Sequence, residues 1–295
     1  MSVLFVSNPS SGSADGDVLA RVRDVLSGLA RVRDFVASSA DAFADELRTA
    51  AGTSDVVVVA GGDGTFSRAV NALSEARSDV VFGLVPMGTG NDLARTLELG
   101  DDPVQVATRL VGSDVKELDL GCITAADGRR FFVNACVGGF SVDVDDALEE
   151  ETKRRMGRFA FWLGGLKAAA DITRYRVRID GREVNDAVVV GVGNGRTVGG
   201  GLELWPDASP DDGLLEACVI SAPDLKGGIR AAVRVKAGTH EGTEGVTMFR
   251  GARIEVSSNP PMELNVDGEV VGFHTPVTFD VEGVFRMLVP ASPGP

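Results

Sequence analysis

The chain has 295 residues, 44% of them apolar, and its 43 acidic residues outweigh 29 basic ones to give a formal net charge of −14. A chain of this length and composition can bury a sizeable core and favours two domains over one. The acidic excess argues against non-specific nucleic-acid binding, and no stretch reaches the roughly 18 uncharged apolar residues that a membrane-spanning helix needs.

Strand and helix signals alternate over the first 120 residues. Apolar runs rich in β-branched residues predict strands, and amphipathic patterns between them predict helices. Such alternation predicts a parallel sheet with helices on its faces. The expected strands are 3–7, 32–37, 55–60 and 80–86, and the expected helices are 18–29, 40–51 and 66–76.

A glycine-rich turn follows each of the last two of these strands. Residues 61–65 are Gly-Gly-Asp-Gly-Thr and residues 88–92 are Gly-Thr-Gly-Asn-Asp, here named the first and second glycine turns. Glycines at the carboxyl ends of parallel strands let the backbone approach a bulky anion closely. The oxygens of that anion can then accept hydrogen bonds from exposed backbone N–H groups. An aspartate among these amides repels phosphate unless a cation lies between them. The two turns together therefore indicate Mg²⁺-nucleotide chemistry, although one such turn alone could be a tight strand–helix connection.

Beyond about residue 120 the pattern changes to short β-rich runs separated by turn residues. Their spacing predicts an antiparallel sandwich or a barrel-like domain, interrupted by one helical segment at about 143–170. The runs are 131–133, 175–179, 187–192, 214–220, 253–256, 262–266 and 275–281.

Both glycine turns, and the segment 86–95 around the second, resemble the diacylglycerol kinase catalytic family, which includes sphingosine kinases and bacterial YegS-like lipid kinases. The resemblance continues through 8–12, 194–201, 206–215 and the Asp-Gly-Glu at 267–269, in the expected order. It implies an α/β nucleotide-binding domain over 1–120, similar to NAD kinases and phosphofructokinases. It also implies a mainly antiparallel β-sandwich over 121–284 for the lipid substrate, with the last strand, 285–290, returning to the first domain.

The resemblance further implies ATP as the phosphoryl donor and assigns roles to single residues. Glu269, at the end of the Asp-Gly-Glu tripeptide, would be the general base for the substrate hydroxyl, with Asp63 as its catalytic companion. A hairpin turn with a solvated carboxylate is the competing interpretation. The expected nucleotide contacts are Asn8, Ser10, Gly61, Gly62, Asp63, Gly64, Thr65, Phe66, Ser67, Gly88, Thr89 and Asn91.

Two Mg²⁺ sites follow from the same resemblance. Asp63 and Asp119 would hold the catalytic ion through water. A structural ion would lie at the tight turn formed by Ser209, Asp212 and Leu214, where an ordinary Asp-Gly turn between strands is the alternative.

The segment 153–178, which is basic and interleaved with aromatic residues, stands out in this acidic chain. Such a composition can place a helix at an anionic lipid surface, but a packing helix with basic ends explains it equally well. The candidate membrane contacts are Lys153, Arg154, Arg155, Arg158 and Trp162.

Cysteine usage and charge suggest the cellular setting. Cys122, Cys136 and Cys218 are scattered and odd in number, which predicts reduced core residues in a cytoplasmic protein that associates peripherally with membranes. The acidic, lysine-poor composition suggests a salt-loving microbial source.

The principal hypothesis is an ATP- and Mg²⁺-dependent kinase of a diacylglycerol-like or dialkylglycerol-like lipid alcohol, a possible homodimer. The alternatives are a soluble-metabolite kinase such as an NAD kinase, and a non-catalytic kinase-derived binding protein. The last is favoured by two departures from the family pattern: Arg68 replaces an acidic residue, and Ser13 stands where a basic residue is common.

Overall fold

The computed structural model describes residues 2–7, 16–28, 30–52, 54–74, 79–110, 112–139, 173–222 and 225–290. The chain divides into two compact units. Unit 1 comprises Met1–Leu120 with Gly283–Pro295, and unit 2 comprises Gly121–Glu282. Two strands, β5 (Asp114–Ala125) and β17 (Val277–Val289), begin in one unit and end in the other.

Unit 1 contains a parallel sheet with the strand order β2-β1-β3-β4-β17. Every residue of β3 and β4 is buried, as expected for strands covered on both faces. Gly61 lies beside Pro86 in the register, so β3 and β4 end at the same level and deliver the two glycine turns side by side. The strands are β1 (Ser2–Ser7), β2 (Arg31–Phe35), β3 (Val56–Gly61), β4 (Val81–Pro86) and the end of β17.

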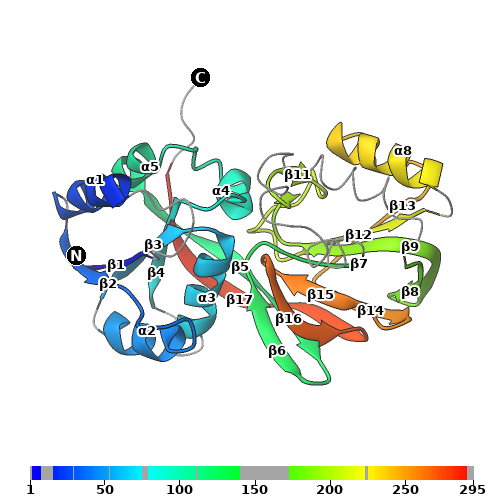
Figure 1. Cartoon of the computed structure of the whole chain (residues 1–295), viewed down its shortest axis with the longest axis horizontal. Coiled ribbons are helices and arrows are strands. Elements are labelled where there is room, and N and C mark those ends of the chain that lie inside the picture. The colour runs from blue at the N-terminus through cyan, green and yellow to red at the C-terminus, as the bar shows by residue number, and fades with distance from the viewer. Residues whose placement is uncertain are drawn as a thin grey trace. The chain divides into compact units, whose positions relative to one another are not determined.

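Helices cover both faces of this sheet. Helices α1 and α5 contact each other on one face, and α2 and α3 contact each other on the opposite face (Figure 1). Phe66 of α3 packs edge-on against Phe82 of β4 and Phe285 of β17, with ring centroids 5.9 and 6.2 Å away, which fixes α3 to the sheet. The described helices are α1 (Gly16–Ser27), α2 (Phe43–Ala51), α3 (Asp63–Leu73), α4 (Asp92–Thr96) and α5 (Pro103–Leu110).

Unit 2 is built from antiparallel strands around the long strand β9 (Arg182–Gly193). The first half of β9 pairs with β8, and its second half pairs with β7 on one side and β12 on the other. Other strands extend this sheet, whereas β10 and β11 form a separate two-stranded sheet. Besides β5, β9 and β17, the strands of unit 2 are β6 (Gly128–Phe132), β7 (Ala135–Gly139), β8 (Tyr175–Ile179), β10 (Thr197–Val198), β11 (Leu202–Glu203), β12 (Leu215–Ser221), β13 (Val246–Gly251), β14 (Arg253–Asn259), β15 (Glu263–Val266) and β16 (Glu269–His274).

Two hydrophobic clusters stabilise unit 2. The larger gathers buried residues from strands β5 to β9, β12, β14, β15 and β17. The smaller surrounds the fully buried Trp205 and includes residues of α8 (Leu225–Lys236). A Cβ at Gly191 would lie 2.7 Å from the Trp205 ring, so the ring packs directly on the backbone of β9.

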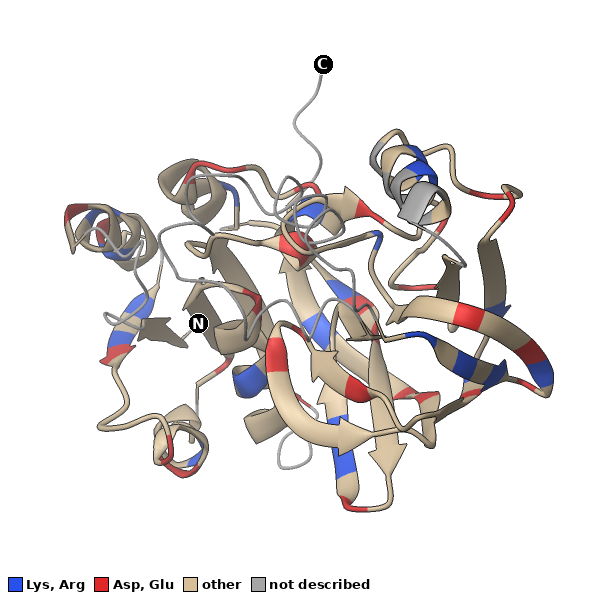
Figure 2. Cartoon of the chain, turned by 45° about the vertical axis from the view of Figure 1, so that its right-hand side comes forward, with Lys and Arg blue, Asp and Glu red and all other residues tan. Residues whose placement is uncertain are grey.

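Along the described strands of unit 2, acidic and basic residues are interspersed (Figure 2). Several of them pair, among them Arg129 with Glu282 at 3.1 Å and Arg253 with Asp280 at 2.9 Å. Exposed pairs of this kind contribute about 0.2–1 kcal/mol each, so the apolar clusters carry most of the stability.

This architecture confirms the predicted fold class: a helix-covered parallel sheet in unit 1 and a mainly antiparallel β domain in unit 2. Helices α4, α5 and α8 were not expected from the sequence, and α3 begins at Asp63, three residues before the expected start at Phe66. The helical segment expected at 143–170 lies outside the described residues.

Candidate functional site

The two glycine turns pack against each other through their backbones. The N–H of Met87 donates to the carbonyl of Gly61 at 2.9 Å. A Cβ at Gly88 would lie 2.5 Å from the Cα of Gly62, so Gly88 has no room for a side chain, and a Cβ at Gly62 would make a tight contact of 3.1 Å with the Cα of Gly88. Glycine is therefore needed here for close approach of two chain segments and not for a positive φ, which neither residue has.

Asp63 links the two turns through its carboxylate. It is the first residue of α3, and its two oxygens accept the backbone N–H groups of Asp92 and Leu93, each at 3.1 Å. These are donors at the start of α4, which the helix itself cannot satisfy. Asp63 thus caps the helix that follows the second glycine turn, a role that the sequence pattern did not reveal.

Asn91 closes the second glycine turn on itself. It has a left-handed conformation, with φ of 53°, which asparagine tolerates better than most residues. Its side-chain oxygen accepts the N–H of Gly88 at 2.9 Å, and its amide donates to the Gly88 carbonyl at 2.8 Å. The Arg95 guanidinium donates to the Gly90 carbonyl at 2.9 Å. The turn is therefore held in one shape by its own side chains.

The predicted nucleotide contacts differ in exposure. Gly62, Asp63, Gly64, Thr65, Gly88 and Asn91 are partly exposed, and Thr89 is exposed. Phe66 and Ser67 are fully buried in unit 1, and Gly61 is buried at the end of β3. Asn8 and Ser10 lie outside the described residues.

Arg68, which departs from the family pattern, makes local contacts. Its guanidinium donates to the carbonyl of Ala40 and lies 5.0 Å from the centroid of the Phe43 ring. It therefore fixes the start of α2 against α3. These two contacts account for the arginine without any role at a ligand.

Asp119 lies on the part of β5 that belongs to unit 1 and is 5% exposed. Among the described residues, no group of three or more His, Cys, Asp or Glu side chains is arranged to hold a metal ion. A metal bound by Asp63 and Asp119 would therefore need oxygen ligands from water or phosphate. This fits a cation that usually keeps several waters, such as Mg²⁺.

Asp267 and Gly268 form the two-residue loop of the hairpin β15–β16. Both have positive φ, 48° and 88°, as a type I′ turn requires, and Val266 pairs with Glu269 across it. The N–H of Gly268 donates to the side-chain oxygen of Asn265 at 2.9 Å. The turn thus gives Glu269 a defined place at the beginning of β16.

The Asp267 carboxylate fixes this hairpin to the segment that joins β6 and β7. One oxygen accepts hydrogen bonds from the backbone N–H groups of Asn134 and Ala135 at 2.9 and 3.0 Å. The other oxygen accepts a hydrogen bond from the N–H of Val133 at 2.9 Å. Asp267 is 4% exposed, so these bonds are shielded from water. The position agrees with a structural role for Asp267 and leaves Glu269 as the more accessible carboxylate of the tripeptide.

Glu269 forms an ion pair with Arg130 of β6, with 2.5 Å between the guanidinium nitrogen and the carboxylate oxygen. Their side chains are 34% and 25% exposed. Sequence reasoning did not single out Arg130. Nothing in the sequence distinguishes Arg130 from the other 23 arginines of the chain, because its partner Glu269 lies 139 residues away.

At the turn predicted to hold a structural Mg²⁺, an arginine side chain of the protein already pairs with the carboxylates. The Arg250 guanidinium contacts Asp212 at 2.5 Å and Glu216 at 2.8 Å. Asp212 also accepts the N–H of Leu214 at 2.9 Å, and the Ser209 hydroxyl donates to Asp211 at 2.6 Å. The Mg²⁺ site at Ser209, Asp212 and Leu214 stays a prediction.

Burial affects the titration of several groups in unit 2. It raises the pKa of Glu216, an effect that the neighbouring Arg250 opposes. It also raises the pKa of Cys122 to about 11, of Cys218 to about 12, and of Cys136 further still. All three cysteines are free and buried, which agrees with the expected inert core thiols.

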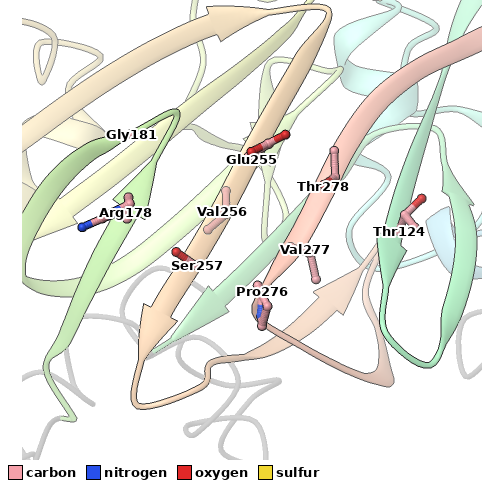
Figure 3. Close-up of a pocket in the computed structure, with 9 residues that line it drawn as sticks. All are labelled: Thr124, Arg178, Gly181, Glu255, Val256, Ser257, Pro276, Val277 and Thr278. Atoms are coloured by element: carbon pink, nitrogen blue, oxygen red, sulfur yellow. The ribbon is translucent and has the colours of Figure 1, made fainter.

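An open cavity of about 340 Å³ lies in unit 2 among strands β5, β8, β14 and β17 (Figure 3). Among the described residues, none that was assigned a role from the sequence lines it. Its lining residues are Thr124, Arg178, Gly181, Glu255, Val256, Ser257, Pro276, Val277 and Thr278. It is therefore separate from the Glu269 hairpin and from the Ser209–Leu214 turn.

The predicted membrane contacts Lys153, Arg154, Arg155, Arg158 and Trp162 lie outside the described residues. In the part of the chain that the structure describes, none of the helices is sufficiently long and apolar for a bilayer crossing.

Comparison with protein families identifies both halves of the chain. Residues 2–123 match the diacylglycerol kinase catalytic domain. Residues 135–289 match the YegS C-terminal NAD kinase beta sandwich-like domain. The two matches together span almost the whole chain.

Curated relatives are similar to this chain over most of their length. A protein of Xanthomonas oryzae pv. oryzae named "Probable lipid kinase YegS-like" is 34% identical over 221 residues, 72% of each chain. A protein of Stenotrophomonas maltophilia with the same name is 32% identical over 247 residues, 80% of this chain and 79% of that one.

Solved structures share the fold. A diacylglycerol kinase from Bacillus anthracis superposes with a TM-score of 0.79 at 23% identity, over 98% of this chain and 97% of that chain. Another crystal structure from the same organism gives a TM-score of 0.84 at 24% identity, over 98% and 95% of the two chains.

Proposed function

Because the chain belongs to the family that joins a diacylglycerol kinase catalytic domain to a YegS-type β-sandwich, we propose that it is an ATP- and Mg²⁺-dependent kinase. The acceptor is the hydroxyl of a lipid alcohol of the diacylglycerol or dialkylglycerol type. Curated relatives named as lipid kinases support the lipid acceptor.

The observation that carries this proposal is the crossing of the two glycine turns at the ends of β3 and β4. Gly62 and Gly88 touch through their backbones, and the Asp63 carboxylate joins the two turns. The result is a rigid, partly exposed stretch of backbone at the carboxyl edge of a parallel sheet, where open α/β sheets bind their ligands. We assign the triphosphate of ATP to this surface.

Mg²⁺ would be held through water by Asp63 and Asp119. The hydrogen bonds from Asp92 and Leu93 hold the Asp63 carboxylate in a fixed orientation at the start of α3. The cation would neutralise phosphate charge during transfer.

Glu269 is the proposed general base. Its side chain is half-buried and lies at a fixed position, because the type I′ turn and the Asp267 anchor hold the start of β16. The carboxylate accepts the proton of the substrate hydroxyl as that oxygen attacks the γ-phosphorus.

The test is phosphoryl transfer from radiolabelled ATP to a total lipid extract, with NAD as the competing acceptor. NAD is included because the C-terminal match is named for its likeness to an NAD kinase sandwich. A labelled lipid identified by mass spectrometry supports the proposal. Labelled NAD alone, or ATP binding without any transfer, would overturn it.

Glu269→Gln tests the assigned base. Turnover should fall by about 100-fold or more, since general bases contribute about 10²–10⁴-fold, while ATP affinity measured by calorimetry stays within about twofold. Glu183→Gln is the matched control, because Glu183 also lies beside arginines, Arg176 and Arg178, but away from the hairpin. Undiminished turnover in Glu269→Gln would contradict the assignment.

The lipid acceptor places the enzyme at a membrane surface, and we assign the membrane contact to the basic segment at 153–178. Replacing Lys153, Arg154 and Arg155 with serine should reduce sedimentation with anionic liposomes. Unchanged sedimentation would rule out this part of the proposal.

A further inference from the structure

Helix α8 has one face in the core of unit 2 and another in solvent. Ala231 and Val235, four positions apart, are buried in the smaller hydrophobic cluster. Arg230 and Arg234, also four positions apart, are exposed, and Val233 is 53% exposed. Because residues three and four positions apart are neighbours on a helix, the two arginines and the valine form one surface. We name it the α8 basic face.

All the charged residues of this helix are basic. Its twelve residues include two lysines and two arginines but no aspartate or glutamate, although the chain has a formal net charge of −14. Figure 2 shows basic residues, and no acidic ones, on the described residues of α8. The helix therefore has the opposite charge to the chain as a whole and is complementary to an anionic partner.

Among the described residues, no acidic side chain forms an ion pair with Arg230 or Arg234. Arginines on the strands of unit 2 are different, as shown by Arg253, which pairs with Asp280 at 2.9 Å. Like charges four positions apart on a helix repel each other, so the two arginines do not stabilise α8 by themselves. A ligand with several negative charges would remove this repulsion.

We propose that the α8 basic face binds the anionic headgroups of a lipid surface, as a contact separate from the basic segment at 153–178. The arginines meet lipid phosphates, while the exposed Val233 lies against the apolar boundary of the headgroup layer. A nucleic acid fits less well, because the helix has no Phe, Tyr or Trp on which bases could stack. The choice of a lipid surface over other polyanions rests on the proposed function, since a lipid acceptor brings the enzyme to a membrane.

The experiment measures sedimentation of the full chain with vesicles of phosphatidylglycerol and phosphatidylcholine in equal parts. Each basic residue near an anionic surface contributes about fivefold to binding, so the double variant Arg230→Gln, Arg234→Gln should lower the partition coefficient about 25-fold. An unchanged partition coefficient overturns the inference.

The double variant Arg182→Gln, Arg253→Gln is the matched control. It removes the same charge from two exposed arginines on strands of unit 2, and it should keep the partition coefficient within about twofold of the wild type. An equal loss in both double variants would show that net charge and not α8 is responsible, and would overturn the inference. Loss of binding to a short single-stranded RNA in the α8 variant, with vesicle binding unchanged, would assign the face to nucleic acid instead.

A fluorescent label on Val233 tests the contact without removing any charge. The native cysteines Cys122, Cys136 and Cys218 are buried, so in Val233→Cys a thiol-reactive nitrobenzoxadiazole label reaches the new cysteine selectively. The emission should shift to shorter wavelength on addition of the anionic vesicles, because the label then leaves water for the headgroup layer, and it should not shift with pure phosphatidylcholine. Unchanged emission with anionic vesicles overturns the inference, even if the arginine variants do not fold.

Failure of this inference is distinguishable from failure of the proposed function. A wild-type chain that phosphorylates diacylglycerol, together with full vesicle binding by the α8 variant, removes only the α8 contact. A wild-type chain that phosphorylates no lipid alcohol removes the proposed function. The label on Val233 and the vesicle binding of the two double variants still decide whether α8 contacts an anionic lipid surface.

Discussion

Gly88 lies against Gly62 so closely that a methyl group on Gly88 would come within 2.5 Å of the Gly62 Cα and 2.9 Å of the Asn91 side-chain oxygen. The reverse contact is less severe, since a methyl group on Gly62 would lie 3.1 Å from the Gly88 Cα. Two turns that are far apart in the sequence form one surface because their contact is backbone to backbone.

Gly88→Ala should therefore separate the two turns. The added methyl group meets rigid backbone, and overpacking of this kind costs about 1–3 kcal/mol. We expect a lower urea midpoint and at least a tenfold weaker affinity for ATP, measured by calorimetry. Gly16→Ala is the control, because a Cβ at Gly16 meets nothing within 4 Å. Equal ATP affinity in Gly88→Ala and the wild type would contradict the assignment of the nucleotide to this surface.

Asp267→Asn should destabilise unit 2. The Asp267 carboxylate accepts three backbone N–H groups, and an amide retains only one acceptor oxygen. Hydrogen bonds to charged groups contribute about 1.5–3 kcal/mol each, so a loss of about 3 kcal/mol in the free energy of unfolding is expected. Urea denaturation measures it. Asp280→Asn, which alters an exposed pair with Arg253, should cost less than about 1 kcal/mol. A similar cost for both variants would show that the Asp267 anchor is not important.

Arg250→Met tests the turn at Ser209–Leu214. Removing the guanidinium leaves the carboxylates of Asp212 and Glu216 without their cation, and because Arg250 is half-exposed the loss is about 1 kcal/mol. We expect added Mg²⁺ to raise the melting temperature of Arg250→Met more than that of the wild type, because Mg²⁺ then occupies the place of the guanidinium. Arg253→Met is the control. An equal rise in wild type and Arg250→Met would instead favour a Mg²⁺ site that coexists with Arg250.

A pH effect is expected where β2 leads into α2. The N–H and hydroxyl of Ser38 donate to Glu46 at 2.8 and 2.5 Å, and these bonds hold the pKa of Glu46 below its ordinary value of 4.5. A lowered pKa in the folded state contributes stability at pH values above 4.5, and this stability is lost as the pH falls through the folded-state pKa. Ser38→Ala should therefore melt at a lower temperature than the wild type at pH 7 but at nearly the same temperature at pH 2.5. A difference that persists at pH 2.5 would show that the loss is not linked to Glu46.

The fold class was predictable because its signals are local. Uninterrupted β-branched runs predicted the buried strands β3 and β4, and regular spacing of turns predicted the antiparallel unit. Helix α8 escaped prediction because Gly227 and Gly228 lie in its first turns, where glycine lowers helix propensity by about 1 kcal/mol each.

The partners within the candidate site could not be predicted, because they come from distant segments. Asp63 accepts hydrogen bonds from residues about 30 positions further along the chain, and Glu269 forms an ion pair with Arg130, 139 positions away. No periodicity or turn chemistry encodes such pairs. The motif resemblance pointed to Asp63 and Glu269 but not to Arg130, nor to the capping role of Asp63.

The sheet of unit 1 is assembled from both extremes of the chain, since the segment after Gly283 supplies the strand that pairs with β4. A ribosome must therefore translate all of unit 2 before this sheet has its fifth strand. Until then Val81 and Phe82 present an open apolar edge, and nascent chains stalled before residue 283 should be especially prone to chaperone capture and proteolysis.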